Sequence, residues 1–168
     1  SAALRLPATI TAEQREAFVD ENLGLLELTT LRDRPVKTLA PGEMKRLTIG
    51  VELCANPAIL ALDEPTTGLD AKSAAVVMKV VRNIASTGRS VLATIHQPSS
   101  SIFLSFDDLL LLERGGRQVF FGELGHMASS FVEFLQGVPG VRKLPPRTNP
   151  ATWMLEEVAR FQAAQLKE

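Results

Sequence analysis

The chain has 168 residues, of which 45% are hydrophobic and 22% are charged, and its formal net charge is −1. This balance is typical of one globular domain and excludes a disordered chain. The absence of a basic run at this charge argues against a nucleic-acid-binding protein. A single cysteine excludes an internal disulfide. No apolar run reaches the roughly 20 residues that a membrane span requires, and because the chain starts at Ser1 without a methionine, we expect a piece of a longer protein.

The N-terminal residues predict an amphipathic helix. Thr11 and Gln14 have the spacing of a capping box, and an apolar face follows them, so we expect a helix from about residue 12 to 28. Residues 29–38 contain Pro35 and predict a loop.

A second helix is expected from about residue 41 to 55, with Pro41 at its first position and Glu43 near its positive end. A Gly-containing turn at a helix N-terminus presents free N–H groups to anions. Taken alone, such a turn is more often only a helix start. Lys45 and Arg46, which follow, are consistent with a solvated face.

The central stretch of the chain is an apolar run that ends in two acids. Ile59 to Leu62 predict a strand buried on both faces of a parallel sheet, and Asp63 and Glu64 follow before Pro65 stops the strand. Ligands of open α/β sheets bind beyond the carboxyl ends of strands. The acid pair therefore suits a Mg-nucleotide site, with Asp63 on the metal and Glu64 facing the water that attacks phosphorus. The alternative is a strand that merely ends in solvated acids.

A βαβ unit is predicted after the acids. A turn at residues 66–70 precedes an expected helix over 71–86, and a second buried strand over 90–95 runs into His96. A histidine at a strand end is more often structural. One crossover from the acid pair, however, a neutral imidazole could hydrogen-bond a terminal phosphate oxygen. The apolar residues expected in the buried stripe of the helix are Val76, Val77, Val80, Val81 and Ile84.

The C-terminal part predicts a hairpin of two strands, 109–113 and 118–121, and then a helix over 124–136. Residues 137–150 contain four prolines and predict irregular structure, after which Asn149 is expected to cap a last helix. The residues expected to pack the 124–136 helix are Met127, Phe131, Phe134 and Leu135.

These motifs, in this order, resemble the C-terminal part of an ABC-transporter nucleotide-binding domain. Leu39–Glu43 resembles the signature motif, Ile59–Glu64 the Walker B strand, Thr67–Asp70 the D-loop and His96 the switch histidine. The resemblance is closest to the G-type subfamily, and within it to the second domain of pleiotropic-drug-resistance transporters. The stretches that carry this closer likeness are 48–53, 93–99, 110–117 and 149–154.

The resemblance implies an α/β, P-loop NTPase-like fold with a parallel sheet and crossover helices, an N-terminal helical subdomain, and no phosphate-loop half. We expect a helical subdomain with the signature helix over 1–56, and the Walker B, D-loop and switch-histidine part with the hairpin over 57–137. Residues 138–168 would then lead toward a transmembrane domain. The implied activity is ATP hydrolysis that drives export across a membrane.

The resemblance also implies roles for single residues. Asp63 would hold Mg²⁺ through water, Glu64 would be the general base or water-positioner, and His96 would sense the γ-phosphate of ATP. The residues expected to contact nucleotide or to couple two nucleotide sites are Ala40, Pro41, Gly42, Glu43, Gly68, Leu69 and Asp70. The implied partners are a second nucleotide-binding domain and a transmembrane domain, with no nucleic acid, at the cytoplasmic face of a membrane such as the plasma membrane.

Two departures from the family pattern bear on these expectations. No G-x-x-x-x-G-K-[ST] sequence occurs in the 168 residues, so the loop that cradles phosphates is missing, as is the adenine-contacting strand. Family members usually have Ser-Gly-Gly where this chain has Ala40-Pro41-Gly42.

Two alternatives stay open. A soluble ABC-type ATPase acting on DNA would carry long heptad arms, which are not present, and a catalytically inert fragment is consistent with the missing loop.

Overall fold

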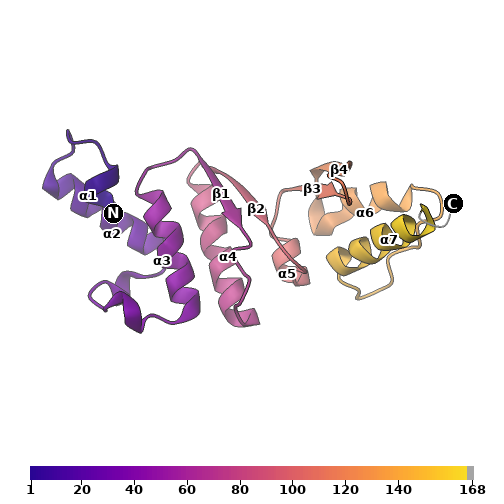
Figure 1. Cartoon of the computed structure of the whole chain (residues 1–168), viewed down its shortest axis with the longest axis horizontal. Coiled ribbons are helices and arrows are strands. Elements are labelled where there is room, and N and C mark those ends of the chain that lie inside the picture. The colour runs from indigo at the N-terminus through magenta and orange to yellow at the C-terminus, as the bar shows by residue number, and fades with distance from the viewer. Residues whose placement is uncertain (166–168) are drawn as a thin grey trace. The chain divides into compact units, whose positions relative to one another are not determined.

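The computed structural model describes the backbone of residues 1–165 and the side chains of residues 1–161. The chain folds into two compact units, one from Ser1 to His96 and one from Gln97 onward (Figure 1). Domain boundaries after residues 56 and 137 stay a prediction. Among the described residues, none of the helices combines the length and hydropathy needed to cross a lipid bilayer.

The first unit begins with helices α1 (Ala2–Arg5) and α2 (Ala12–Leu25). The predicted capping box is confirmed, because the Thr11 hydroxyl accepts from Gln14 N at 3.2 Å and the Gln14 side chain accepts from Thr11 N at 2.9 Å. Helix α2 ends before the predicted residue 28, and Glu27 takes a positive φ of 53°. Two short 3₁₀ turns, η1 (Thr29–Leu31) and η2 (Val36–Thr38), lie in the predicted loop.

Helix α3 (Pro41–Leu53) packs against the end of α2 through a buried arginine. Arg46 Nη1 donates to the carbonyl oxygens of Leu26 and Glu27, at 2.7 and 2.8 Å. The interpretation of Arg46 as part of a solvated face is therefore wrong. The reason is the helix end itself, whose last carbonyls have no intrahelical partner and need a donor from elsewhere.

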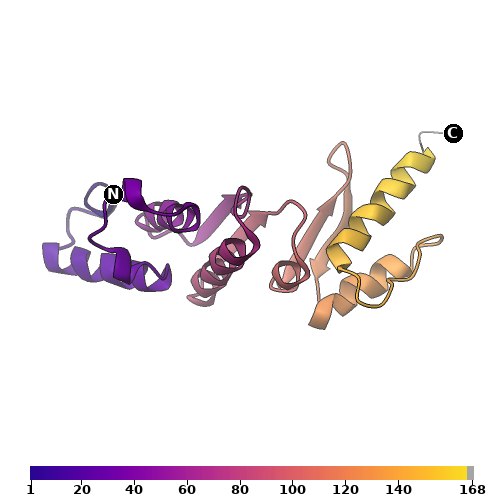
Figure 2. The ribbon, with the colours of Figure 1, turned by 90° about the horizontal axis from the view of Figure 1, so that it is seen from below.

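Strands β1 (Ile59–Asp63) and β2 (Ser90–Thr94) pair with each other in parallel. Helix α4 (Ala71–Ser86) connects them, which confirms the βαβ unit. Helix α4 lies along the strand pair in both views (Figures 1 and 2). Its predicted stripe is buried at Val77, Val80, Val81 and Ile84, whereas Val76 is half-buried.

The strands are not buried on both faces, so that prediction is wrong for the described residues. Leu60 is buried, whereas Ile59 is 70% exposed and Leu92 is 62% exposed. Side chains alternate along a strand, and Leu92 pairs with Ala61, two residues from Ile59, so these three share one face. We call Ile59, Ala61 and Leu92 the bare face; α4 covers the other face.

The second unit contains α5 (Ser100–Phe103), a hairpin of β3 (Asp108–Leu112) and β4 (Gln118–Glu123), a short turn η3 (His126–Ala128), α6 (Ser129–Gln136) and α7 (Pro150–Gln165). The hairpin is antiparallel with an irregularity between Leu111 and Leu112, which confirms the predicted strand pair. Asn149 Oδ1 accepts from Ala151 N at 3.0 Å, which confirms the predicted cap of α7.

Phe131 of α6 is at the centre of the core of this unit. Its ring meets those of Phe120 and Phe103 edge-on, with centroids 5.1 and 6.2 Å apart. The buried members of this core are Phe103, Leu111, Leu124, Ala128, Phe131, Leu135, Ala151, Trp153 and Met154.

Met127 is exposed, so the prediction that it packs the helix is wrong, whereas Phe134 is partly exposed but does pack against the hairpin. Helix α6 starts only at Ser129, because Met127 and Ala128 have positive φ angles of 53° and 61°. Met127 is thereby out of helical register. Phe134 lies on the outer side of α6, where its ring contacts Phe120 with centroids 4.9 Å apart.

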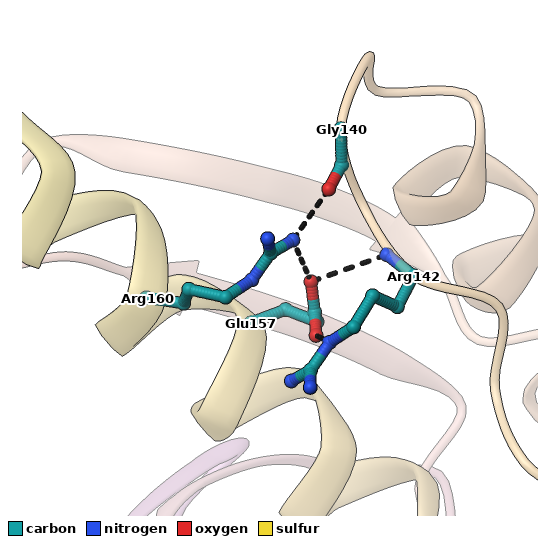
Figure 3. Close-up of polar contacts among 4 residues, drawn as sticks. All are labelled: Gly140, Arg142, Glu157 and Arg160. Atoms are coloured by element: carbon teal, nitrogen blue, oxygen red, sulfur yellow. Dashed lines mark hydrogen bonds and ion pairs between the residues drawn. The ribbon is translucent and has the colours of Figure 1, made fainter.

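The fully buried carboxylate of Glu157 joins helix α7 to the irregular segment that precedes it (Figure 3). Glu157 Oε1 accepts from Arg142 Nε at 2.6 Å, and Oε2 accepts from Arg142 N at 3.2 Å and from Arg160 Nη2 at 2.6 Å. Arg160 also donates to the carbonyl of Gly140. Burial by itself raises the pKa of Glu157, but the hydrogen bonds from Arg160 and Arg142 outweigh it and hold the pKa below its ordinary value.

Candidate nucleotide site

The acid pair lies at the carboxyl end of β1 and is exposed, as the sequence predicts. Asp63 is in register with Thr94, the last residue of β2. The Thr94 hydroxyl donates to Asp63 Oδ1 at 2.6 Å and accepts from Glu64 N at 2.9 Å. One hydroxyl therefore fixes the carboxylate of Asp63 and the backbone of Glu64. Sequence reasoning missed Thr94, although its place two residues before His96 in the second strand was the available signal.

Glu64 leaves the strand in an unusual backbone conformation. Its φ is +43°, in the left-handed region that side chains other than glycine rarely adopt. Its carboxylate oxygen Oε2 accepts from the Thr67 hydroxyl at 2.7 Å. The turn after the strand thus holds this carboxylate beyond the edge of the sheet, in a defined orientation and accessible to solvent.

The predicted D-loop leads directly into α4. Gly68 has a φ of +78°, which favours glycine at this turn. Asp70 caps the helix, because Oδ1 accepts from Ser73 N at 2.9 Å and Oδ2 accepts from the Ser73 hydroxyl at 2.8 Å. These two hydrogen bonds lower the pKa of Asp70. Leu69, between them, is half-buried.

The predicted signature turn contacts this same helix start. Gly42 is buried in the first turn of α3, and a Cβ atom at Gly42 would lie 3.1 Å from Ser73 Cβ. Glycine therefore favours the close approach of α3 to α4, because any side chain here would crowd Ser73. Ser73 connects Gly42 on one side with Asp70 on the other, so the signature turn and the D-loop form one packed unit.

Some of the backbone hydrogen-bonding groups at the start of α3 are paired with residues of the same turn. The Glu43 carboxylate accepts from Ala40 N at 2.8 Å, and Met44 N donates to the Ala40 carbonyl at 2.9 Å. Pro41 has no N–H to donate. Gly42 and Glu43 lie in the first turn of α3, where backbone N–H groups have no preceding carbonyl within the helix, so this turn can present donors to an anion.

His96 follows β2 at the same edge of the sheet and is exposed. Asp63, Glu64 and Thr94 are joined by hydrogen bonds, and His96 is two residues farther along the chain. In the described part of the chain, no hydrogen bond or ion pair joins the acid pair to the signature turn. The structure therefore forms two groups, the acids with Thr94 and Thr67, and Gly42 with Ser73 and Asp70.

The donors at the acid pair fit a magnesium ion of the kind that nucleotides bring. No group of three metal-ligating side chains gathers anywhere in the described residues. Magnesium in nucleotide sites is commonly held by one or two carboxylates, with waters and phosphate oxygens as the other ligands. Asp63 has one oxygen bonded to Thr94, and its carboxylate is exposed, so it can serve as such a ligand.

Two protein families match the chain. Residues 4–67 match the family described as ABC transporter, and residues 96–163 match the family described as ABC-2 type transporter. The first match includes the signature turn and the acid pair. The second begins at His96 and includes nearly all of the second unit.

Close relatives are plant transporters. The chain is 51% identical over 161 residues to ABC transporter G family member 44 of Oryza sativa subsp. japonica and to pleiotropic drug resistance protein TUR2 of Spirodela polyrhiza, which covers 93% of this chain. It is 50% identical over 167 residues to ABC transporter G family member 38 of Arabidopsis thaliana. The chain spans only 11–12% of the length of these relatives.

Solved structures of isolated cassettes confirm the predicted α/β, P-loop NTPase-like fold class. A structure of MJ1267, an ATP-binding cassette of an ABC transporter, aligns with a TM-score of 0.59 at 27% identity, covering 70% of this chain and 45% of that one. The dimeric bacterial cassette MJ0796 aligns with a TM-score of 0.57 at 22% identity, covering 73% and 53%. The family matches, the relatives and the fold agree: this chain belongs to the ABC transporter family, and nearly its whole length is similar to one segment of the G family and pleiotropic drug resistance members.

Proposed function

We propose that this chain supplies the Walker B acids, the D-loop, the switch histidine and a degenerate signature to the ATP-hydrolysing domain of a membrane exporter. The observation that carries the proposal is the acid pair at the carboxyl end of β1, where Thr94 fixes Asp63 and Thr67 holds the Glu64 carboxylate. Solvated acids at a strand end would not need two hydroxyl groups to orient them. This arrangement favours a chemical role over the alternative of a simple strand end.

The proposed roles follow from what each side chain can do. Glu64 orients the attacking water and accepts its proton, since its carboxylate is held in place and faces solvent. Asp63 holds Mg²⁺, which would neutralise charge on the phosphates of bound ATP. His96 donates a hydrogen bond to the terminal phosphate as a neutral imidazole. Positioning and charge stabilisation supply most of the rate enhancement in such transfers.

The signature and D-loop residues are proposed to act across a dimer of nucleotide-binding domains. Gly42 and Glu43 would offer their N–H groups to the phosphate bound by the partner domain, beside Ala40 and Pro41. Gly68, Leu69 and Asp70 would pass the state of one site to the other through the packed contact with Ser73. The dimeric structure of the bacterial cassette MJ0796 supports such a partner.

The proposed setting is an integral membrane transporter. Residues 96–163 match a family described as ABC-2 type transporter, which supports a transmembrane domain in the intact protein. The nucleotide-binding domain would then lie at the cytoplasmic face of a membrane, for which the plasma membrane is our proposal.

The test is a pair of substitutions in the full-length transporter. Glu64→Gln keeps the size of the side chain but removes the carboxylate, so we expect turnover to fall by about a hundredfold or more while nucleotide binding is retained. Asp63→Asn should instead weaken Mg-dependent ATP binding. ATP hydrolysis and equilibrium binding of a fluorescent ATP analogue measure the two effects.

The matched control is Glu21→Gln, the same chemical change at an exposed position of α2. It should leave both measurements unchanged. Wild-type hydrolysis by the Glu64→Gln transporter would show that Glu64 does not have the proposed role.

A further inference from the structure

The start of α7 is joined to the loop that carries His96 by a single side chain. Asn149 Nδ2 donates to the carbonyl oxygen of Pro98 at 2.8 Å, across 51 positions of sequence. Pro98 is two residues after His96, and Gln97 between them has a positive φ of 45°. Nothing in the assigned roles of the signature, the acids or the histidine uses Asn149.

Both functional groups of the Asn149 amide are occupied. Its Oδ1 accepts from Ala151 N at 3.0 Å and caps α7, while its Nδ2 holds the Pro98 carbonyl. A capping role needs only the oxygen, and serine, threonine or aspartate would serve it as well. The nitrogen therefore does something else: it fixes the backbone directly after the histidine.

Helix α7 is itself firmly held within its unit. Ala151 and Trp153, in its first turn, are buried in the core, and Glu157 is tied to Arg142 and Arg160 one turn farther on. The Pro98 carbonyl is thus bonded to a fixed point. A loop with a residue at positive φ would otherwise have several conformations available.

We propose that Asn149 is a positioning residue for His96, which sets the direction of the imidazole by restraining the Gln97–Pro98 backbone. This inference rests on the proposed role of His96 in ATP hydrolysis. It adds a connection between the phosphate-sensing loop and the helix at the C-terminal end of the described chain.

Asn149→Asp separates the two roles of the side chain. Aspartate keeps the oxygen that caps α7, so the melting temperature of the full-length transporter should change little. It loses the donor to Pro98 and places a negative charge against a carbonyl oxygen. We expect kcat for ATP hydrolysis to fall about tenfold, with KM for ATP within about twofold of wild type.

The decisive measurement is a double-mutant cycle with His96→Ala in the full-length transporter. If Asn149 acts through His96, Asn149→Asp should have almost no further effect on kcat once the imidazole is gone. Gln136→Glu, an amide-to-acid change at an exposed position of α6, is the control and should match wild type. Additive losses in the cycle, or a wild-type kcat for Asn149→Asp, would overturn the inference.

If the proposed function itself is wrong, the same experiments give a different result. In that case Glu64→Gln or His96→Ala would leave hydrolysis intact, whatever the result at Asn149. A normal loss with those two variants and no coupling to Asn149 would reject only the positioning role.

Discussion

The two units of this chain differ in the kind of sheet that carries exposed apolar residues. The first unit has a parallel strand pair, and the second has an antiparallel hairpin, on which Leu110, Leu112 and Phe121 are also exposed. In the second unit Phe131 is fully buried and Trp153 nearly so, and even the charged Glu157 is enclosed with its partners. In the first unit the bare face leaves Ile59 and Leu92 largely exposed beside the acid pair. Parallel sheets occur almost only with both faces covered.

An antiparallel hairpin can leave one face in solvent, whereas a parallel pair rarely does, so the bare face indicates that the sheet of the first unit lacks a covering layer. The chain covers only 45% of one solved cassette and 53% of another, so a cassette of this fold contains about as much again. The residues proposed to take part in ATP hydrolysis, Asp63, Glu64 and His96, are in the first unit. Thr94 and Thr67, which orient the acids, are in the same unit, whereas Asn149 is in the second unit.

The largest expected effect is the absence of ATP hydrolysis by the 168-residue chain alone. No phosphate-loop sequence occurs in it, so the lysine and backbone N–H groups that would hold the β- and γ-phosphates are lacking. Each charge-assisted hydrogen bond of that kind is worth about 1.5–3 kcal/mol, and the loss of several removes useful affinity. Calorimetry that detects micromolar ATP binding to the purified chain would contradict this prediction.

The next effect concerns the altered signature. Ala40 has no hydroxyl and Pro41 has no N–H, so two donors to a phosphate are missing from the site that this turn would close. At about 1.5–3 kcal/mol each, their loss corresponds to a hundredfold or more in rate. We therefore predict one competent site, which uses Asp63, Glu64 and His96, and one weak site at the Ala40–Glu43 turn.

This asymmetry is tested by blocking the turn in the full-length transporter. Ala40→Trp adds bulk at an exposed position and avoids Gly42, where any side chain would crowd Ser73. Steady-state hydrolysis should be largely spared by Ala40→Trp and lost in Glu64→Gln. Equal loss in both variants would mean that this signature closes a working site.

A smaller effect is expected at Glu157, the buried carboxylate of the second unit. Glu157→Ala removes the anion that both Arg142 and Arg160 bind, and breaking a buried pair from one side is costly. We expect the melting temperature of the chain to fall by about 5 °C or more. Trypsin should also cut faster after Arg142 and Lys143. Glu156→Ala, at the exposed neighbouring position, is the control, and an equal fall in both variants would contradict a special role for Glu157.

The smallest effect is a pH dependence at Asp70. Hydrogen bonds from Ser73 lower its pKa in the folded state, so the ionised form stabilises the fold. That stability is fully present above the unfolded pKa of about 4 and is lost as the pH falls through the lower folded value. Urea unfolding at pH 7 and pH 3 should show a smaller difference in Asp70→Asn, which keeps an oxygen for the cap. The same difference in both proteins would rule out this contribution.

The parts of the fold that local chemistry determines could be predicted from sequence. The caps Thr11 and Asn149 and the first-turn proline Pro41 indicated where three helices begin, and the apolar run before Asp63 indicated the first strand. Burial could not be predicted in the same way. Ile59 has the pattern of a buried strand residue, but its exposure depends on which other parts of the fold are present.

Long-range polar contacts were the other gap. The hydrogen bond between Thr94 and Asp63 needs the register of two strands, and that between Asn149 and Pro98 needs the packing of a whole unit. Arg46 was misjudged for the same reason, since its partners are the two backbone carbonyls that directly follow helix α2. Composition and periodicity carry no information on such pairings.

The bare face also has a consequence for the behaviour of the purified chain. In the described residues its sheet has only two strands, each with an unpaired outer edge, and the apolar side chains of Ile59 and Leu92 lie between those edges. Unprotected edges beside exposed apolar surface are templates for strand addition by another molecule. We therefore expect the chain to self-associate as its concentration rises. Leu92→Lys should suppress that association, because it places a positive charge on the exposed face of the strand pair.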